Sequence, residues 1–145
     1  MALFNSLNTS ASGMTAQRVR TDIIAQNIAN VNTTRDENGN VYRRKNVIFE
    51  ERDVTGFSKI LLRTAGTVGD GVKVTKIYED TESPTRLVYD PSHPDANEDG
   101  YVEYPNVNTV QEMTDMIDAT RSYEANVTAF NATKNMALKA LDLGK

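Results

Sequence analysis

The chain has 145 residues, a formal net charge of −4, one histidine and no cysteine. This length suits one ordinary domain, and the absence of cysteine excludes disulfides and thiolate metal sites. Residues 79–103 hold eight acids against one base, Arg86, and the sequence lacks the broad basic face of nucleic-acid binders. We therefore expect no nucleic-acid partner, no metal site and no cofactor.

The first six residues lack the basic segment and the continuous apolar segment of a cleavable secretory signal. No apolar run approaches the roughly 18 residues of a membrane span. We therefore expect no membrane insertion, and we expect any export to use a route without signal cleavage.

Residues 3–32 are predicted to form a long amphipathic helix, because apolar residues recur there at spacings of three and four. Gly13 lies inside this run, where glycine costs about 1 kcal/mol relative to alanine. Asn30 and Asn32 are either a helix C-cap or a polar hinge between the helix and the body, and the two interpretations are compatible. The residues expected to pack against other subunits are Leu3, Leu7, Met14, Ile24 and Ile28.

The middle of the chain is predicted to hold short strands and turns. Strands are expected at 41–50, 57–63, 72–78, 86–90 and 101–104, with a loop at 34–40 and a hairpin turn at 69–71. The basic run Arg43-Arg44-Lys45 indicates one charged edge of a subunit contact or a solvated strand edge, with binding of an anionic surface as the alternative.

A second long helix is predicted to begin at Asn108 or Thr109 and to run to about residue 143. Thr109 and Glu112 have the spacing of a capping box, in which each side chain bonds a free amide of the first turn. Eight positions from Met116 to Ala140 follow the strict alternation of three and four found in coiled-coil seams. The residues expected to pack against other subunits are Met113, Met116, Ile117, Tyr123, Val127, Phe130, Leu138 and Leu141.

The length of this second helix has a consequence for assembly. It would be roughly 50 Å long, whereas a compact chain of this size is roughly 40 Å across. Its apolar stripe therefore needs a partner from the N-terminal helix, from other subunits, or from both. The predicted class is α+β, with paired terminal helices and a small β-rich middle.

Two features resemble sites. Residues 95–100 match the first half of a calcium loop, but the twelfth position is Asn106 instead of glutamate, so an Asx-rich turn is the favoured interpretation. His93 lies between prolines beside Asp95 and is expected to fix a turn by hydrogen bonding. A general base or metal ligand at His93 is the alternative, which leaves a soluble enzyme and a calcium-binding module as rival functions.

Several long motifs resemble one known family. Residues 10–20 and 28–34 read SASGMTAQRVR and IANVNTT, which look like the N-terminus of bacterial flagellar rod and hook proteins. Residues 42–45, 47–50 and 86–95 read YRRK, VIFE and RLVYDPSHPD, and narrow the resemblance to proximal-rod subunits of the FlgC type. Residues 105–108 and 113–126, PNVN and MTDMIDATRSYEAN, resemble the C-terminal helix of that family.

The resemblance implies a structural protein and no enzyme. It implies a terminal helical domain at 1–33 and 107–145 that lines a channel, and a β-rich outer domain at 34–106. It implies polymerisation with copies of itself and neighbouring rod proteins into the hollow basal-body rod in the cell envelope. It further implies transit through the flagellar type III export apparatus. On this view a charge at Val127 or Phe130 is expected to block rod formation.

Overall fold

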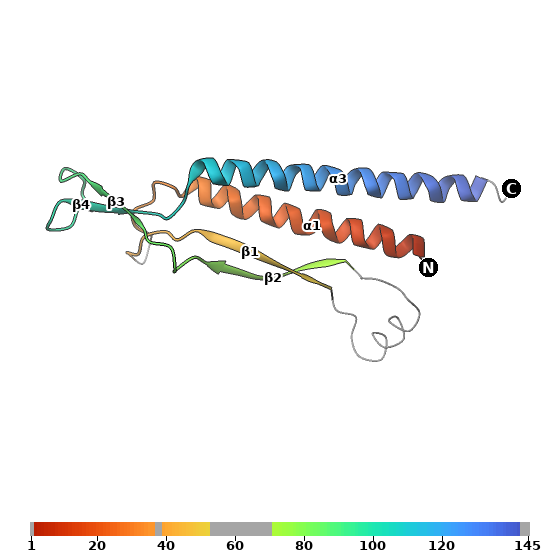
Figure 1. Cartoon of the computed structure of the whole chain (residues 1–145), viewed down its shortest axis with the longest axis horizontal. Helices are drawn as coiled ribbons and strands as arrows, with labels where there is room; N and C mark the ends of the chain where they lie inside the picture. Colours follow the sequence, from red (N-terminus) through yellow and green to blue (C-terminus); the bar gives the residue numbers. More distant parts are fainter. Residues whose placement is uncertain (1, 37–38, 53–70, 143–145) are drawn as a thin grey trace, which may run out of the picture. The chain divides into compact units, whose positions relative to one another are not determined.

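A computed structural model describes residues 2–36, 39–52 and 71–142 of the chain. The elements, in order, are α1 (Ala2–Ala29), β1 (Lys45–Glu51), β2 (Val72–Glu79), β3 (Arg86–Tyr89), β4 (Tyr101–Tyr104) and α3 (Thr109–Asp142) (Figure 1). The predicted α+β class, with a long helix at each end and small antiparallel sheets between them, is confirmed. The strand predicted at 57–63 lies outside the described residues.

Contacts within the chain divide it into two compact units. Unit 1 comprises Met1–Val19, Ile48–Lys76 and Ala119–Lys145, and unit 2 comprises Arg20–Val47 and Ile77–Asp118. Each unit contains part of α1, part of α3 and part of the β1–β2 pair, whereas β3 and β4 lie wholly in unit 2. The division into a terminal helical domain and a β-rich outer domain stays a prediction.

The four strands form two separate two-stranded sheets. β1 and β2 are antiparallel, since the amide of Arg52 donates to the carbonyl of Gly71 and the amide of Asp80 donates to that of Arg44, both at 2.8 Å. In the second sheet β3 pairs antiparallel with β4, and Tyr89 lies opposite Tyr101 with the ring centroids 5.3 Å apart. Cross-strand pairs of this kind stabilise small sheets.

In unit 1, α1 contacts both α3 and β2. The hydroxyl of Ser12 accepts a hydrogen bond from the amide of Val72 at 3.0 Å. A Cβ atom built on Gly13 would lie 2.8 Å from Oδ1 of Asn126, so glycine permits a close approach of the two helices. This contact explains a glycine inside a helix, where local propensity disfavours it.

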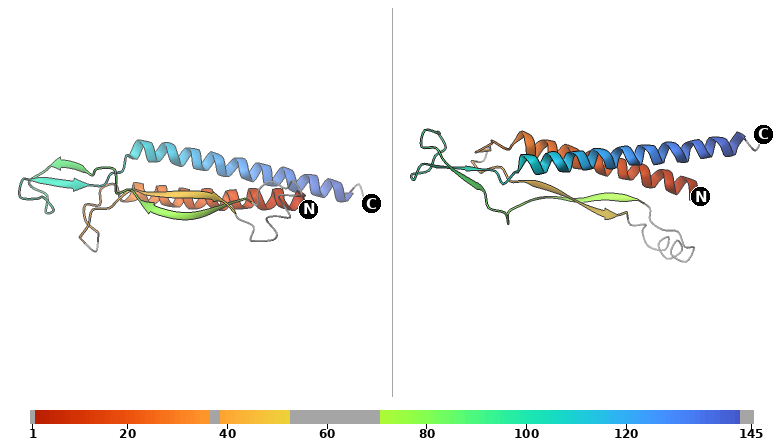
Figure 2. Two further views of the ribbon diagram at one scale, coloured as in Figure 1. Left: turned by 60° about the horizontal axis from the view of Figure 1, so that its bottom comes forward. Right: turned by 45° about the horizontal axis from the view of Figure 1, so that its top comes forward.

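In unit 2 the helices α1 and α3 are also paired, and two contacts define their relative direction. Asn27 bonds Glu112, and Arg20, earlier on α1, forms an ion pair with Asp115, later on α3. The helices are therefore antiparallel (Figure 2).

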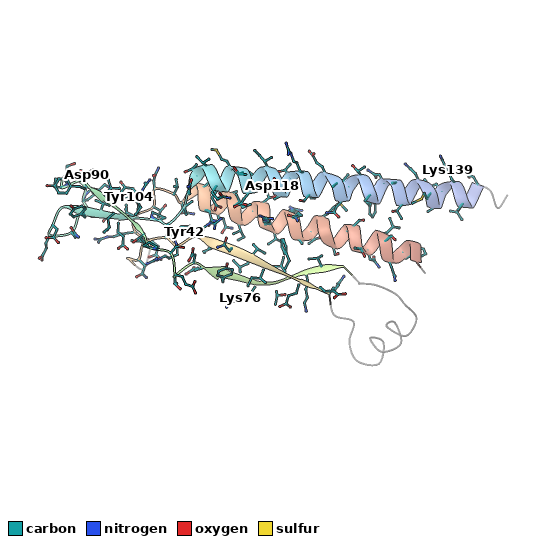
Figure 3. All side chains as sticks on the ribbon, viewed as in Figure 1. Tyr42, Lys76, Asp90, Tyr104, Asp118 and Lys139 are labelled. Atoms are coloured by element: carbon teal, nitrogen blue, oxygen red, sulfur yellow. The ribbon has the colours of Figure 1, made fainter. Side chains whose placement is uncertain are left out.

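The core of the described residues is small and partly polar. Figure 3 shows the described side chains on the ribbon. The buried apolar side chains are Ala16, Ile23, Ile24, Val102, Val107 and Ala119. The buried polar side chains are Ser10, Asn27, Glu112 and Thr133. Alanine, serine and threonine remove little apolar area from water, so burial along the helix pair supplies only a modest driving force.

Replacing Gly71 by alanine is expected to destabilise the fold more than replacing Gly39. Both glycines have a positive φ, +102° and +81°, which costs an L-residue about 1–2 kcal/mol. At Gly71 a Cβ would also lie 2.2 Å from Oγ of Ser12, whereas at Gly39 nothing lies within 4 Å. The extra clash should add about 1–3 kcal/mol. Urea unfolding of both variants measures the difference, and equal losses would contradict the packing of Gly71 on α1.

Candidate functional site

One face of α3 turns toward α1. Ala119 and Thr133 are buried on this face, and Asn126 contacts Gly13 directly. These residues belong to the three-four series predicted from the sequence, whose members Met116, Phe130 and Ala137 are half-buried. The series therefore has a partner within its own chain over much of its length. Tyr123 and Ala140, from the same series, are exposed.

A second apolar stripe on α3 is exposed. Val110, Met113 and Ile117 are 74%, 54% and 53% exposed, and Leu138 and Leu141 are 50% and 70% exposed. The spacings of three and four within Val110, Met113 and Ile117 place these three residues along one side of the helix in unit 2, whereas Leu138 and Leu141 belong to unit 1. We call Val110, Met113 and Ile117 the exposed α3 stripe.

The residues predicted to pack against other subunits fall into three groups. Ile24 is buried within the chain, and the side chain of Leu3 lies outside the described residues. The half-buried group is Leu7, Met14, Ile28, Met116, Val127 and Phe130. The exposed group is Met113, Ile117, Tyr123, Leu138 and Leu141. Contacts of any of them with another subunit remain predictions.

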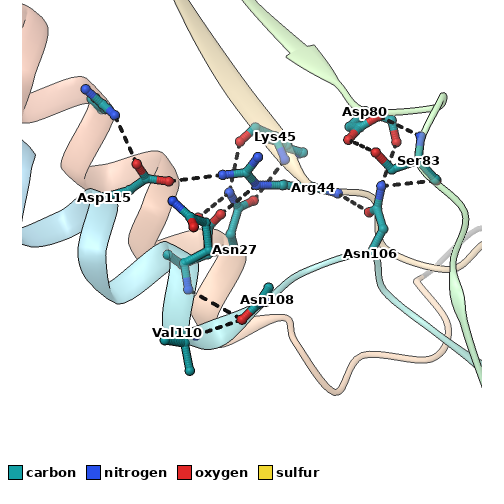
Figure 4. Close-up of polar contacts among 12 residues, drawn as sticks. Asn27, Arg44, Lys45, Asp80, Ser83, Asn106, Asn108, Val110 and Asp115 are labelled. Atoms are coloured by element: carbon teal, nitrogen blue, oxygen red, sulfur yellow. Dashed lines mark hydrogen bonds and ion pairs between the residues drawn. The ribbon is translucent and has the colours of Figure 1, made fainter.

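Unit 2 contains a buried polar cluster of Asn27, Arg44 and Glu112 (Figure 4). Asn27 is 1% exposed and Glu112 is fully buried. Nε of Arg44 lies 2.6 Å from Oε1 of Glu112, and Nδ2 of Asn27 donates to Oε2 at 2.9 Å. Both oxygens of the buried carboxylate are therefore engaged, one of them by a positive charge.

The amide of Asn27 uses its full hydrogen-bonding capacity. Its Oδ1 accepts from the hydroxyl of Tyr42 and from the amide of Lys45, each at 2.9 Å. Its Nδ2 donates to the carbonyl of Lys45 and to Glu112. An asparagine side chain has two donors and two acceptor positions, so these four bonds satisfy it completely.

The surroundings of this cluster change the pKa of Tyr42. Burial, followed by the nearby carboxylates of Glu112 and Glu79, raises the pKa of the Tyr42 phenol above its ordinary value. The phenol therefore stays protonated and donates to Asn27 at neutral pH.

One prediction made from the sequence is wrong here. The Thr109–Glu112 capping box does not form: Oδ1 of Asn108 accepts from the amide of Val110 at 3.0 Å, and the carboxylate of Glu112 turns to Asn27 and Arg44. Of the alternatives for the basic run, a solvated strand edge does not hold at Arg44, which bonds Glu112 and also Asp115 at 3.2 Å, and a charged edge of a subunit contact stays a prediction. Asn108 as the first capping residue agrees with one of the two predicted helix starts.

The sequence carried a signal for the cluster that we did not interpret. Asn27 follows the buried Ile23 and Ile24 by four and three residues, so a polar side chain interrupts an apolar face. Glu112 extends the three-four series backwards from Met116. Polar residues at seam positions often indicate buried partners that specify pairing.

Asn106 joins the cluster to the turn after β2. Its Oδ1 accepts from the amide of Arg44 at 2.9 Å, and its Nδ2 donates to the carbonyl of Asp80 at 3.0 Å. Within that turn, hydrogen bonds from the Ser83 hydroxyl and amide hold the pKa of Asp80 below its ordinary value. Because the pKa of Asp80 is lower in the folded chain than in the unfolded chain, its ionised carboxylate stabilises the fold. This stabilisation is fully present above the unfolded pKa of Asp80 and is lost as the pH falls through its folded pKa.

The Ser83→Ala variant is expected to raise the pKa of Asp80 toward its ordinary value, because it removes the largest favourable contact of the carboxylate. An NMR titration of the Asp80 carboxyl measures the change. Ser92→Ala is the matched control, since Ser92 makes the corresponding contacts with Asp90. An Asp80 pKa that responds equally to both variants would contradict the assignment.

The other two site-like features are local turns. Nδ1 of His93 accepts from the amide of Asp95 at 3.1 Å, which confirms the predicted turn histidine. The carboxylate of Asp95 is engaged by the hydroxyl of Thr34 at 2.7 Å and by Arg35 at 3.0 Å. Oδ1 of Asn97 accepts from the amides of Asp99 and Tyr101, as in an Asx turn.

The Asn-rich end of α1 is a helix C-cap. The amide of Asn30 donates to the carbonyl of Gln26, and its carbonyl accepts from the amide of Thr33 at 3.0 Å. Asn32 is exposed beyond it. Within the described ranges no group of three or more histidine, aspartate or glutamate side chains could hold a metal ion. Neither described helix has the length and apolar character needed to cross a bilayer.

Comparison with known proteins identifies the class of this chain. Residues 7–35 match the family described as Flagella basal body rod protein, and residues 98–143 match the Flagellar basal body rod FlgEFG protein C-terminal family. Both helices thus carry the features of rod subunits, and the chain is a structural protein of the flagellar basal body.

The particular family follows from full-length relatives, each called flagellar basal-body rod protein FlgC. The chain is 53% identical to that of Bacillus subtilis over 100% of both chains. It is 47% identical to that of Borreliella burgdorferi over 97% of both chains, and 37% identical to that of Salmonella typhimurium over 100% of both. The chain therefore belongs to the FlgC family of rod proteins, whose role is structural and not enzymatic. As a rod subunit it is located in the basal body and assembles with other rod components.

Proposed function

We propose that this subunit polymerises with copies of itself and with neighbouring rod proteins into the hollow shaft that transmits flagellar rotation. In this proposal residues 1–33 and 107–145 form the inner helical domain and residues 34–106 the outer one. The subunit reaches the growing rod through the flagellar type III export apparatus without signal cleavage. Ordering of the terminal helices on assembly confines polymerisation to the end of the rod.

The exposed α3 stripe is the observation that carries this proposal. The inner face of α3 is already occupied by α1, yet Val110, Met113 and Ile117 present a second apolar row to solvent. Burying one such side chain stabilises an interface by about 1.5–3 kcal/mol. A regular row of large apolar side chains along an exposed helix is typical of a surface that packs against another helix.

In unit 1, Leu138 and Leu141 near the end of α3 are also exposed, at 50% and 70%, and they offer a further apolar contact to a neighbouring subunit.

Deletion of the gene in its host, followed by electron microscopy of basal bodies, tests the proposal. Missing rods and hooks that return with the wild-type gene are the expected result. Intact rods in the deletion strain would reject the subunit as a required part of the shaft. A gene carrying only a silent change serves as the control for expression.

A further inference from the structure

We propose that the buried polar cluster of Asn27, Arg44 and Glu112 selects the register of α1 against α3. In this proposal the cluster determines which turns of the two helices meet, while apolar burial along the seam supplies little of that choice. The inference concerns a single chain, so it does not rest on the proposed contacts between copies.

The observed register is consistent with a heptad repeat. Within unit 1, Gly13 of α1 contacts Asn126 of α3, and within unit 2, Asn27 contacts Glu112. The two contacts are 14 residues apart on α1 and 14 residues apart on α3. Fourteen residues are two heptads, the repeat at which a coiled-coil seam returns to the same face.

Apolar packing alone would not distinguish this register from its neighbours. The buried seam residues of unit 1 are Ser10, Ala16, Ala119 and Thr133, all small. A shift of one heptad would place Gly13 opposite Ala119 or Thr133, which are small as well, so these positions contribute little apolar burial that depends on the register. Pairs with such uniform surfaces need a polar or charged residue to specify alignment.

A shift by one heptad in either direction would break the cluster. In one direction Asn27 would face Ala119, whose methyl group cannot accept the hydrogen bond that Nδ2 donates to Glu112. In the other direction Asn27 would face Pro105, which precedes the start of α3 at Thr109. Either shift removes one of the four hydrogen bonds of Asn27 and separates the buried carboxylate of Glu112 from Asn27 and Arg44, which is strongly unfavourable.

The cluster also ties the helix register to the start of β1. Asn27 bonds both the amide and the carbonyl of Lys45, and Arg44 bonds Glu112 and Asp115 of α3. The segment before β1 is therefore held at one level along α1 and α3. A helix pair in another register would lose this attachment.

Oxidative cross-linking in the full chain tests the inference, because the chain contains no native cysteine. A Gly13→Cys/Asn126→Cys pair reports the observed register, since a Cβ at residue 13 would lie 3.0 Å from Cγ of Asn126. Gly13→Cys/Ala119→Cys and Gly13→Cys/Thr133→Cys report the two shifted registers, each combined with Asn126→Ala because a Cβ at residue 13 would lie 2.8 Å from Oδ1 of Asn126. In an otherwise native chain the first pair is expected to cross-link at least about tenfold faster than the others.

Asn27→Leu/Arg44→Met/Glu112→Leu removes the cluster without leaving an unpaired charge. In this background the three cross-linking rates are expected to come within about threefold of each other, with helix content by circular dichroism retained. Arg20→Met is the matched control, since it removes the more exposed ion pair with Asp115 between the same helices. The control should keep the native preference.

Three outcomes would overturn the inference. Retention of the native preference in the triple variant would show that the register is set elsewhere. Loss of helix content in that variant would show that the cluster supplies stability instead of alignment. Absence of the 13–126 cross-link in the parent chain would show that the helices do not adopt this register at all.

Discussion

Replacing Ile117 by aspartate is expected to prevent incorporation of this subunit into the rod while leaving the isolated chain folded. Ile117 is 53% exposed and belongs to the exposed α3 stripe, so its side chain contributes little to the fold of one chain. An unpaired carboxylate buried in a subunit interface costs several kcal/mol, which corresponds to at least a hundredfold loss of assembly. Rod incorporation, measured by immunoblot of purified basal bodies and by swimming in soft agar, should fall to background.

Gln111→Asp is the matched control for this experiment. It places the same charge on α3 at an exposed position that is not three or four residues from any member of the stripe, and it should support normal swimming. Loss of swimming in both variants would indicate that any added charge on this part of the helix blocks assembly, and would count against the stripe as the specific surface. Val127 and Phe130 are less suitable positions, because both are half-buried within their own chain.

Replacing Arg44 by methionine is expected to destabilise the chain by about 3 kcal/mol. Glu112 is fully buried, and Arg44 is the positive charge that contacts it, at 2.6 Å. Methionine retains much of the aliphatic stem of arginine, so the loss should come mainly from the unpaired carboxylate. The Arg44 side chain is itself 26% exposed, so the expected loss of stability lies at the lower end of the range for breaking a buried ion pair. Urea unfolding monitored by circular dichroism measures the change.

Arg43→Met is the control for this second prediction. The guanidinium of Arg43 donates to the carbonyl of Ser83 at 3.1 Å, whereas Glu112 is bonded by Arg44 and Asn27. Its replacement should cost no more than about 1 kcal/mol, the value of a single exposed hydrogen bond. Equal losses of stability on replacing Arg43 and Arg44 would mean that the basic run contributes only its net positive charge, as a solvated strand edge would.

The helices were predictable because their determinants are local. The apolar period covers α1 and α3, and the predicted ends at 3–32 and 109–143 lie close to Ala2–Ala29 and Thr109–Asp142. Asn30 ends the first helix and Asn108 caps the second through bonds to residues within four positions. Capping and period depend on neighbours in sequence, so they can be interpreted without knowledge of the tertiary structure.

The first strand shows where local reasoning failed. It was predicted from residue 41 but begins at Lys45. The preceding residues have a suitable composition, but the amide of Arg44 donates to the side chain of Asn106 and the amide of Lys45 donates to the side chain of Asn27. Side chains from α1 and from the segment before α3 thus take the hydrogen-bonding positions that a longer strand would need.

By itself, the sequence determined the α+β class, the two terminal helices, the turn around His93 and, through its long motifs, membership of the rod family. Each of these depends on spacing and chemistry within a short segment. Only the tertiary structure decided that Asn27, Arg44 and Glu112 share one buried cluster. Asn27 and Glu112 are 85 residues apart and Arg44 and Glu112 are 68 apart, so their contacts exist only after the helices have paired. The same pairing decided which side of α3 is covered by α1 and which side remains exposed, because a helical period reveals that a face is apolar but not what covers it.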